Sequence, residues 1–287
     1  MKINLLRRRR KKAGKGRALR PLGWAAAAGF GWLAYAYLTL PDVRPLADTN
    51  PQTTAFVELR AREAHASGKK TPRHVQRWVP YSRISPNLKR AVLVAEDAAF
   101  WEHEGVDYDE LQKSIELDWT RGLMRGASTI TQQLAKNLYL SPSRNPIRKF
   151  RELIIARRLE AELDKARIFE IYLNVIEWGD GIWGAEAAAR TYYGVPSAAL
   201  GPSQAALLAG AIINPRLLNP AEPTPRLLRR QQIILKRMGG VTPPEPAKPL
   251  APPPPEPSEP LPGQPVTPDE LPPPPADDGG ARADPKQ

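Results

Sequence analysis

A run of 19 residues without a charge, Leu22 to Leu40, directly follows a strongly basic N-terminal segment. As a helix this run is about 28 Å long, close to the thickness of the hydrocarbon core of a bilayer. Residues 1–20 hold ten Lys and Arg and no acid, and the positive-inside rule places such a segment in the cytoplasm. The sequence therefore predicts a basic cytoplasmic tail at 1–20, a single transmembrane helix as anchor at 21–40, and the rest of the chain on the other side.

Two other interpretations of the N-terminal region stay open. The tripeptide Ala34-Tyr35-Ala36 fits the A-x-A cleavage site of a signal peptide, although the residues after it remain apolar. The basic run from Arg7 to Lys12 is also of a kind that binds nucleic acid. Its place directly before an apolar span favours a membrane, so we expect no nucleic-acid partner.

The chain after the anchor divides into three parts by composition. Residues 41–79 are a mixed, proline-interrupted connector, and residues 80–240 carry long helical patterns, which predict a mainly α domain. Residues 241–287 hold 18 of the 33 prolines and eight acids against three bases. Such a composition is typical of a disordered Pro-rich acidic tail. The absence of Cys excludes disulfides and thiolate metal sites.

The stretch Glu96 to Gly105 is the first candidate for chemistry. Leu93, Glu96, Asp97 and Phe100 recur at i, i+3, i+4 and i+7, which on a helix would place them on one face among apolar neighbours. Burial raises the pKa of a carboxylate and suits it to accept a proton near neutral pH. The alternative is the solvated last turn of an ordinary helix.

The segment Gly126 to Asn137 is polar and opens a predicted helix, for which Ser128 or Thr129 can serve as the N-cap. A helix N-terminus with hydroxyls, amides and Lys136 favours an anion. Plain capping with a polar helix face explains the same residues equally well. A nucleophilic role for Ser128 is disfavoured, because no G-x-S-x-G setting surrounds it.

Arg148, Lys149 and Glu152 lie three and four residues apart, so on a helix both cations reach the carboxylate. Ile155, Ala156, Leu159 and Leu163 continue the same face. Two cations and a carboxylate beside an apolar stripe suit a phosphate group, either directly or through a divalent cation. A surface ladder of salt bridges is the alternative.

Two later segments have structural patterns. Lys165 to Asn174 places Ile168, Ile171, Tyr172 and Val175 at core spacing, which predicts a buried helix. The glycines of Trp178 to Gly184 allow a tight turn before a helix of small residues that ends at Gly194. His103 has no second His at ligand spacing, so the sequence does not predict a metal site on it.

In order and spacing these segments resemble the five motifs of the family 51 peptidoglycan glycosyltransferases. The matching stretches are E-D-x-x-F-x-x-H-x-G at 96–105, G-x-S-T-x-T-Q-Q at 126–133, R-K-x-x-E at 148–152, the K-x-x-I-x-E-x-Y-L-N-like stretch at 165–174 and G-x-x-G-x-x-x-A-A-x-x-Y-(F/Y)-G at 181–194. Phe169 and Tyr193 replace commoner apolar residues of similar size. The resemblance covers roughly residues 80–240.

The resemblance implies a mainly α, lysozyme-like two-lobed glycosyltransferase domain at the outer, periplasmic face of the inner membrane. It implies that lipid II is the acceptor and that a growing glycan on undecaprenyl pyrophosphate is the donor. Other cell-wall or division proteins are candidate partners. Mg²⁺ or another divalent cation is a candidate cofactor with Glu152 as a candidate ligand, and no organic cofactor is expected. Residues 106–125 resemble a mobile segment that touches the membrane.

The family's functional residues carry over onto matching positions of this chain. Glu96 matches the general base, and Glu152 matches the second glutamate, which supports the departing pyrophosphate together with nearby cations. The remaining matches are implied to bind substrate: Asp97, Phe100, His103, Gly126, Ser128, Thr129, Thr131, Gln132, Gln133, Lys136, Asn137, Arg148 and Lys149.

Two other functions compete with this interpretation. A lytic enzyme of similar fold could cleave the same polymer with a glutamic acid, but it would not need the cationic pair Arg148 and Lys149. A membrane-anchored scaffold with the Pro-rich tail as bait would not need five ordered motifs.

Overall fold

The computed structural model describes residues 23–24, 27–31, 35, 37–68, 73–108, 112, 128–143 and 145–240. The basic tail, part of the predicted anchor, most of the segment 106–125, Gly126 and the acidic tail lie outside the described residues. The described part consists mainly of helices, as the sequence predicts. No helix within it has both the length and the apolar character needed to cross a bilayer.

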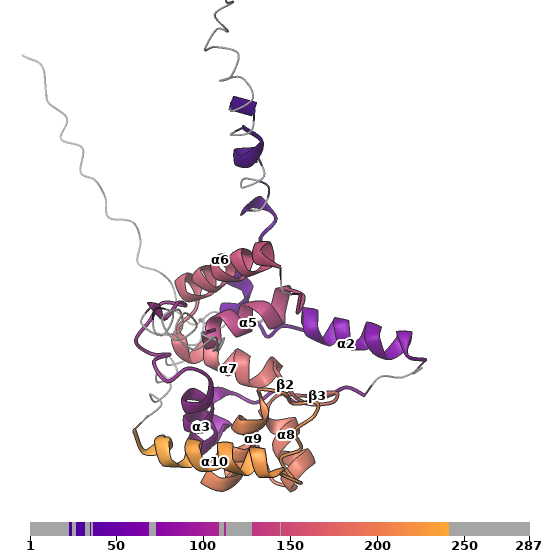
Figure 1. Cartoon of the computed structure of the whole chain (residues 1–287), viewed down its shortest axis with the longest axis vertical. Helices are drawn as coiled ribbons and strands as arrows, with labels where there is room; N and C mark the ends of the chain where they lie inside the picture. Colours follow the sequence, from indigo (N-terminus) through magenta and orange to yellow (C-terminus); the bar gives the residue numbers. More distant parts are fainter. Residues whose placement is uncertain are drawn as a thin grey trace, which may run out of the picture. The chain divides into compact units, whose positions relative to one another are not determined.

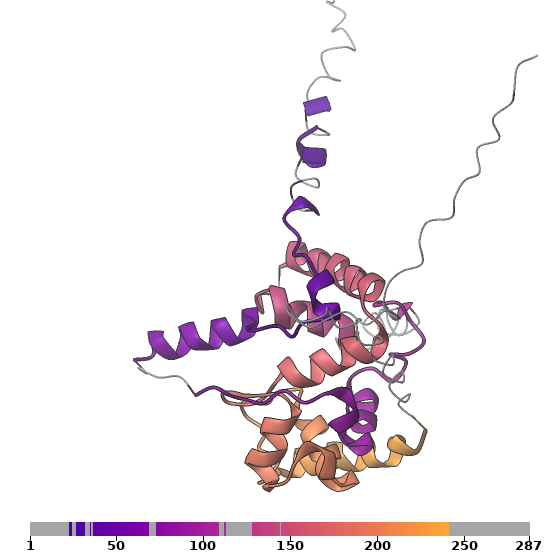
Figure 2. The ribbon, with the colours of Figure 1, turned by 180° about the vertical axis from the view of Figure 1, so that it is seen from behind.

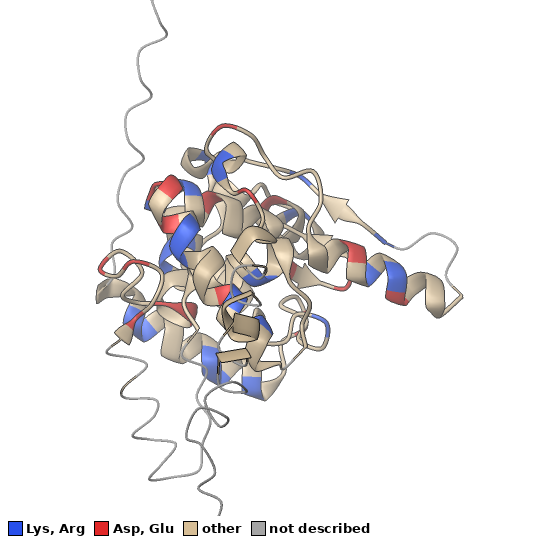
Figure 3. Cartoon of the chain, turned by 90° about the horizontal axis from the view of Figure 1, so that it is seen from above, with Lys and Arg blue, Asp and Glu red and all other residues tan. Residues whose placement is uncertain are grey.

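One group of helices is built around α5 (Ile130–Tyr139). It packs against α6 (Pro146–Glu162) and α7 (Lys165–Val175), and α2 (Ala55–Ala66) joins it from the side (Figure 1). Acidic and basic residues both occur along α2 (Figure 3), where Arg60 pairs with Glu63 at 2.8 Å. The same guanidinium reaches the buried Glu177 at 3.0 Å, which fixes α2 to the sheet region.

A second group contains α3 (Pro86–Glu96), α9 (Pro202–Ala211) and α10 (Pro225–Arg237). α9 contacts both other helices, and the view from behind shows the three together below α7 (Figure 2). α8 (Ala185–Tyr193) also lies in this lower part and contacts α7. α9 is rich in Ala and Leu and mostly buried, and α10 is basic and amphipathic; both lie within the helical domain predicted for residues 80–240.

A small three-stranded sheet and four 3₁₀ turns complete the described fold. The strands β1 (Val75–Gln76), β3 (Ile182–Trp183) and β2 (Glu177–Gly179) lie side by side in that order, with β1 parallel and β2 antiparallel to β3. The 3₁₀ turns are η1 (Arg44–Ala47), η2 (Tyr81–Arg83), η3 (Ser197–Ala199) and η4 (Met238–Gly240). Gly181 turns the chain between β2 and β3 with φ of 69°, and a Cβ there would lie 2.3 Å from the Arg73 carbonyl oxygen.

Capping residues set the helix starts. Ser85, Thr129, Asn145, Asp164 and Thr224 each accept a backbone N–H with the side chain at the start of α3, α5, α6, α7 and α10. These oxygens satisfy donors that lack a partner within the helix. Proline in the first turn of α3, α6, α9 and α10 has the backbone angle that a helix start requires.

One hydrophobic core runs through both groups of helices. Its centre is α7, whose Ile168, Ile171, Tyr172 and Val175 have no exposed surface, so the predicted buried helix is confirmed. The Asn174 side chain accepts from Val79 N at 2.9 Å and donates to Val79 O at 2.9 Å. This buried amide thereby ties the connector before η2 to the core helix.

Candidate active site

Glu96 is the last residue of α3, and its side chain is 13% exposed. Its Oε2 accepts a hydrogen bond of 3.0 Å from Nε2 of Gln133 on α5. Burial raises the pKa of Glu96, while the Gln133 hydrogen bond and the charges of Arg230 and Lys136 oppose this rise. A carboxylate of this kind takes up a proton more readily than an exposed one, as a general base requires.

The helix around Glu96 is shorter than the sequence pattern indicates. α3 ends at Glu96, and Asp97 leaves it with φ of −167° and ψ of 83°, so the shared helical face predicted for Leu93, Glu96, Asp97 and Phe100 is wrong beyond Glu96. The Asp97 carboxylate instead accepts from Ile130 N at 2.9 Å and from His103 Nε2 at 3.1 Å. These bonds outside α3 compensate for ending the helix, and they place Asp97 at the positive N-terminus of α5.

Glu152 lies on the inner face of α6 and is 2% exposed. Its Oε1 accepts from Lys149 Nζ at 2.5 Å, and its Oε2 accepts from Arg148. The same ammonium donates to Gln132 Oε1 at 2.8 Å and to Ser128 Oγ at 3.1 Å. The predicted pairing of both cations with Glu152 is confirmed, and it joins α6 to the start of α5.

Lys136 lies on α5 one turn after Gln132. Burial lowers the pKa of its ammonium, and the neighbouring charges that act on it include Glu96 and Glu152 as well as Arg148 and Lys149. Its Nζ lies over the ring of Phe56, 5.9 Å from the ring centre. Lys136 therefore connects the carboxylate at the end of α3 electrostatically with the cationic cluster on α6.

Several other residues from the sequence-based prediction occupy supporting positions. Phe100 has no exposed surface and packs against Trp101 and Phe169. Thr129 Oγ1 and Gln132 Nε2 both donate to the Gly105 carbonyl, at 2.8 and 3.1 Å. These contacts fix the turn after α3 against α5.

Two more of these residues also bond to neighbouring parts of the protein. The fully buried Thr131 donates from Oγ1 to Glu160 at 2.5 Å. Asn137 donates from Nδ2 to the Gln133 carbonyl at 2.8 Å. Gly126 lies outside the described residues.

Two residues at Glu96 were not among the predicted site residues. Arg230 on α10 reaches Oε1 of Glu96 at 3.5 Å, and Tyr172 on α7 donates to Gln133 Oε1 at 2.9 Å. Arg230 follows Leu227 by three residues and precedes Ile234 by four, so it lies on the inner face of the amphipathic helix. The sequence signal that could have identified Arg230 is a cation on the apolar face of an amphipathic helix.

Asp97, His103 and Asp107 form a group that could hold a cation, since one donor atom from each lies within 4.8 Å of the others. It is the single such group in the described part of the chain. Two carboxylates and an imidazole suit a transition-metal ion better than Mg²⁺, which prefers oxygen ligands. His103 Nδ1 is buried without a hydrogen-bond partner among the described residues.

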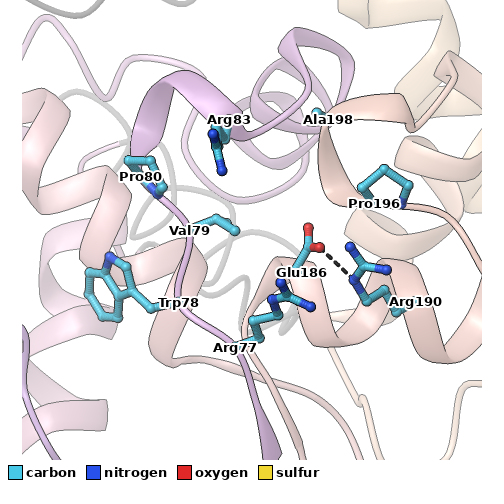
Figure 4. Close-up of a pocket in the computed structure, with 9 residues that line it drawn as sticks. All are labelled: Arg77, Trp78, Val79, Pro80, Arg83, Glu186, Arg190, Pro196 and Ala198. Atoms are coloured by element: carbon cyan, nitrogen blue, oxygen red, sulfur yellow. Dashed lines mark hydrogen bonds and ion pairs between the residues drawn. The ribbon is translucent and has the colours of Figure 1, made fainter.

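A separate pocket of about 200 Å³ lies between η2, α8 and η3. Figure 4 shows that Arg77, Arg83 and Arg190 surround Glu186 there. Glu186 is already engaged, because it accepts from Arg190 Nε at 2.6 Å and from Ser197 N at 2.7 Å. None of the residues at Glu96 or Glu152 lines this pocket.

The cluster around Glu96 and Glu152 combines a largely buried carboxylate whose pKa is raised with three cations that can stabilise an anion. Such groups suit a reaction in which an anionic leaving group departs and a nucleophile loses a proton. The fold and the site therefore define a helical group-transfer enzyme.

Comparison with known proteins gives the family. The transglycosylase family model matches residues 64–239. The biosynthetic peptidoglycan transglycosylase of Laribacter hongkongensis is 51% identical over 197 residues, which cover 68% of this chain and 86% of the relative. The protein of the same name from Chromobacterium violaceum is 45% identical over 218 residues, 75% of this chain and 95% of the relative. The chain belongs to the transglycosylase family, and it is a peptidoglycan glycosyltransferase of cell-wall biosynthesis.

Proposed function

We propose that this protein polymerises lipid II into β-1,4-linked glycan and that Glu96 is its general base. The observation that carries the proposal is the position of Glu96. It ends α3 and accepts a hydrogen bond from Gln133, and the charge of Lys136 opposes the rise in its pKa that burial causes. The charges of Glu152, Arg148 and Lys149 act on the same lysine. A proton acceptor and an anion site are thereby coupled through one lysine.

In the proposed reaction the 4-hydroxyl of the acceptor sugar attacks the anomeric carbon of the donor. Glu96 takes the hydroxyl proton as the new C–O bond forms. The bond from the anomeric carbon to the pyrophosphate breaks, and its electron pair leaves with undecaprenyl pyrophosphate. Attack from the face opposite the leaving group inverts the centre from α to β.

The cations have the role of stabilising the leaving group. Lys136, Arg148 and Lys149 supply positive charge where the pyrophosphate gains negative charge, which lowers the barrier most in a site with little water. Glu152 holds Arg148 and Lys149 in place through its two carboxylate oxygens. Gln132 on α5 and Ser128, which precedes that helix, orient the Lys149 ammonium by accepting hydrogen bonds from it.

A divalent cation belongs to this proposal as a candidate only. Asp97, His103 and Asp107 are the described residues that would hold it, and it would add positive charge close to Glu96. Glu152, which the sequence suggested as a ligand, is occupied by two cationic side chains.

The location also belongs to the proposal. A single-pass anchor at 21–40 would place the N-terminus in the cytoplasm and a lysozyme-like two-lobed domain in the periplasm, at the inner membrane. The uncharged run after ten cations supports this topology. The contact of Arg151 on α6 with Thr39, whose carbonyl accepts at 3.1 Å, brings the end of that run to the catalytic helices.

The test is an incubation of detergent-purified protein with labelled lipid II, with and without divalent cation, followed by separation of the products on a gel. Ladders of long glycan from the wild type and none from Glu96→Gln are expected. A parallel incubation with preformed glycan tests the lytic alternative. Shortened glycan without ladders would overturn the proposed reaction.

A further inference from the structure

The pocket between η2, α8 and η3 has no part in the proposed reaction, yet its lining is cationic. Among the described residues that line it, three arginines and one glutamate carry charge, which leaves two positive charges uncompensated. Figure 4 shows the guanidinium groups of Arg77, Arg83 and Arg190 around one space. Like charges brought together in this way repel one another, so an anion between them would relieve the repulsion.

The single acid of the pocket does not neutralise all three arginines. Glu186 is 4% exposed, and its two oxygens accept from Arg190 Nε at 2.6 Å and from Ser197 N at 2.7 Å. Burial opposes ionisation of this carboxyl, but the hydrogen bonds from Ser197 and Arg190 outweigh it and lower the pKa of Glu186. Glu186 therefore stays ionised and bound within the wall, while Arg190 keeps further N–H donors for a ligand.

The other two arginines have their charged ends available. Within the part of the chain that the structure describes, neither the Arg77 nor the Arg83 guanidinium forms a hydrogen bond or an ion pair, and both residues are exposed. A guanidinium presents a planar fork of N–H donors that matches the oxygens of a carboxylate or a phosphate. Two such forks from different elements can hold one ligand from two sides.

Hydrogen bonds fix the walls of the pocket. Ser197 is fully buried, its Oγ donates to the Arg83 carbonyl at 3.3 Å, and its own carbonyl accepts from Ser85 N at 3.2 Å. Asn174 holds both backbone groups of Val79. The uncharged lining residues are apolar: Trp78, Val79, Pro80, Pro196 and Ala198. A fixed and partly apolar pocket loses little freedom on binding and screens charge less than open water does, and both effects favour an anion there.

We propose that this pocket binds a small oxyanion with two negative charges, held by Arg77, Arg83 and Arg190. The volume of about 200 Å³ suits a phosphate group or a short dicarboxylate, and the oxygens of both pair with guanidinium forks. In an enzyme of peptidoglycan synthesis a peptide is the source of carboxylates, and a lipid head group or free phosphate is the source of phosphate. The site is separate from Glu96 and Glu152, so it holds its ligand without reacting with it.

The experiment is an NMR titration of the full chain in detergent, labelled with ¹⁵N-arginine, with inorganic phosphate and separately with glutarate. The single variants Arg77→Ala and Arg83→Ala assign the Nε–H signals of these two residues. Both signals should follow a saturating curve for at least one anion, with a dissociation constant of about 1 mM or lower. Saturation by phosphate alone identifies a phosphate site, and saturation by glutarate alone identifies a carboxylate site.

A pair of double variants with equal charge tests whether the pocket makes the contact. Arg77→Ala/Arg83→Ala should weaken binding, followed at the Nε–H of Arg190, by about tenfold or more. Arg62→Ala/Arg229→Ala removes two charges from exposed positions on α2 and α10 and should leave the affinity unchanged. Equal weakening in both double variants would overturn the proposal, because it would show attraction by net charge alone. Shifts that rise linearly with both anions would also overturn it.

Repeating the titration with Lys136→Ala separates this pocket from the cationic cluster. Lys136 acts at that cluster and does not line the pocket, so the Arg77 and Arg83 signals should saturate at the same anion concentration as in the wild type. Loss of their saturation in Lys136→Ala would place the bound anion at the cationic cluster and overturn the proposal. The titration contains no lipid II, so its result does not depend on whether the wild type forms glycan ladders.

Discussion

The guanidinium of Arg230 on α10 lies 3.5 Å from Oε1 of Glu96 at the end of α3. The same nitrogen also reaches the Ala95 carbonyl at 3.5 Å. This contact places a cation from the end of the domain beside the proposed base, on the carboxylate oxygen that Gln133 does not occupy. It opposes the rise in the pKa of Glu96 that burial causes.

Replacement of Arg230 by Ala should therefore raise the pKa of Glu96. The base would be protonated over a wider range, so the rate should fall roughly tenfold on the acid limb and much less above it. Arg229→Ala is the matched control, because it removes the same charge from an exposed position of α10. Equal pH profiles for the two variants would contradict a role of Arg230 at Glu96.

Glu96→Gln should lower the rate of polymerisation by about 10²–10⁴-fold, the usual contribution of a general base. The protein should also become more stable at pH 8. Because the folded state raises the pKa of Glu96, the ionised carboxylate costs stability above that pKa, and this cost vanishes below the unfolded value near 4.5. Thermal unfolding at pH 8 and pH 4 measures it: the melting temperature of the variant should exceed that of the wild type only at pH 8.

Lys136→Ala should weaken binding of a pyrophosphate-linked donor by roughly 10- to 100-fold, because a partly buried cation makes a charge-assisted contact with the anion. The melting temperature should not fall, since burial of this ammonium disfavours its charged form. Direct titration with a non-reactive pyrophosphate-sugar analogue checks the affinity. Arg62→Ala, an exposed charge on α2, is the control. Unchanged affinity in Lys136→Ala would remove this lysine from the anion site.

The pH–rate profile should have an acid limb and a basic limb. The two limbs should lie closer together than the ordinary pKa values of Glu and Lys. Glu96 must be ionised, and its raised pKa moves the acid limb above 4.5. Lys136 must be protonated, and its lowered pKa moves the basic limb below 10.5. A profile of kcat/KM against pH measures both limbs. Loss of the basic limb in Lys136→Arg, whose guanidinium stays charged, would assign it to this residue.

Asn174→Ala should destabilise the domain by about 3 kcal/mol or more, since it leaves the N–H and the C=O of Val79 without partners in the core. The melting temperature should fall by roughly 6–12 °C. Asn219→Ala, at an exposed turn, should change it little. A small effect of Asn174→Ala in thermal unfolding would mean that water replaces the lost bonds.

The parts of the site that follow from one helix could be predicted from the sequence. Arg148, Lys149 and Glu152 are neighbours on α6 because residues three and four apart share a helix face. Thr129 as the cap of α5 and Gly194 as the end of α8 follow from local backbone chemistry in the same way. These features need no knowledge of tertiary structure.

Other parts depend on packing between distant segments. Glu96 and Arg230 meet because α10 packs against α3 directly and both helices pack on α9. Tyr172 was correctly expected in the core, but its hydroxyl contact with Gln133 depends on how α5 lies on α7. The end of α3 at Glu96 was missed because the bonds of Asp97 go to Ile130 and His103, beyond the reach of a helical pattern.

The contact between Arg151 and Thr39 has a consequence for the reach of the enzyme. Arg151 is the immediate neighbour of Glu152 on α6. Its hydrogen bonds to Thr39 therefore hold the segment that begins at residue 37 next to the cationic cluster. The contact between Thr39 and α6 therefore lies directly beside Glu152. With the proposed membrane anchor, this contact would hold the cationic cluster near the bilayer surface, at the depth where a lipid-linked leaving group is presented.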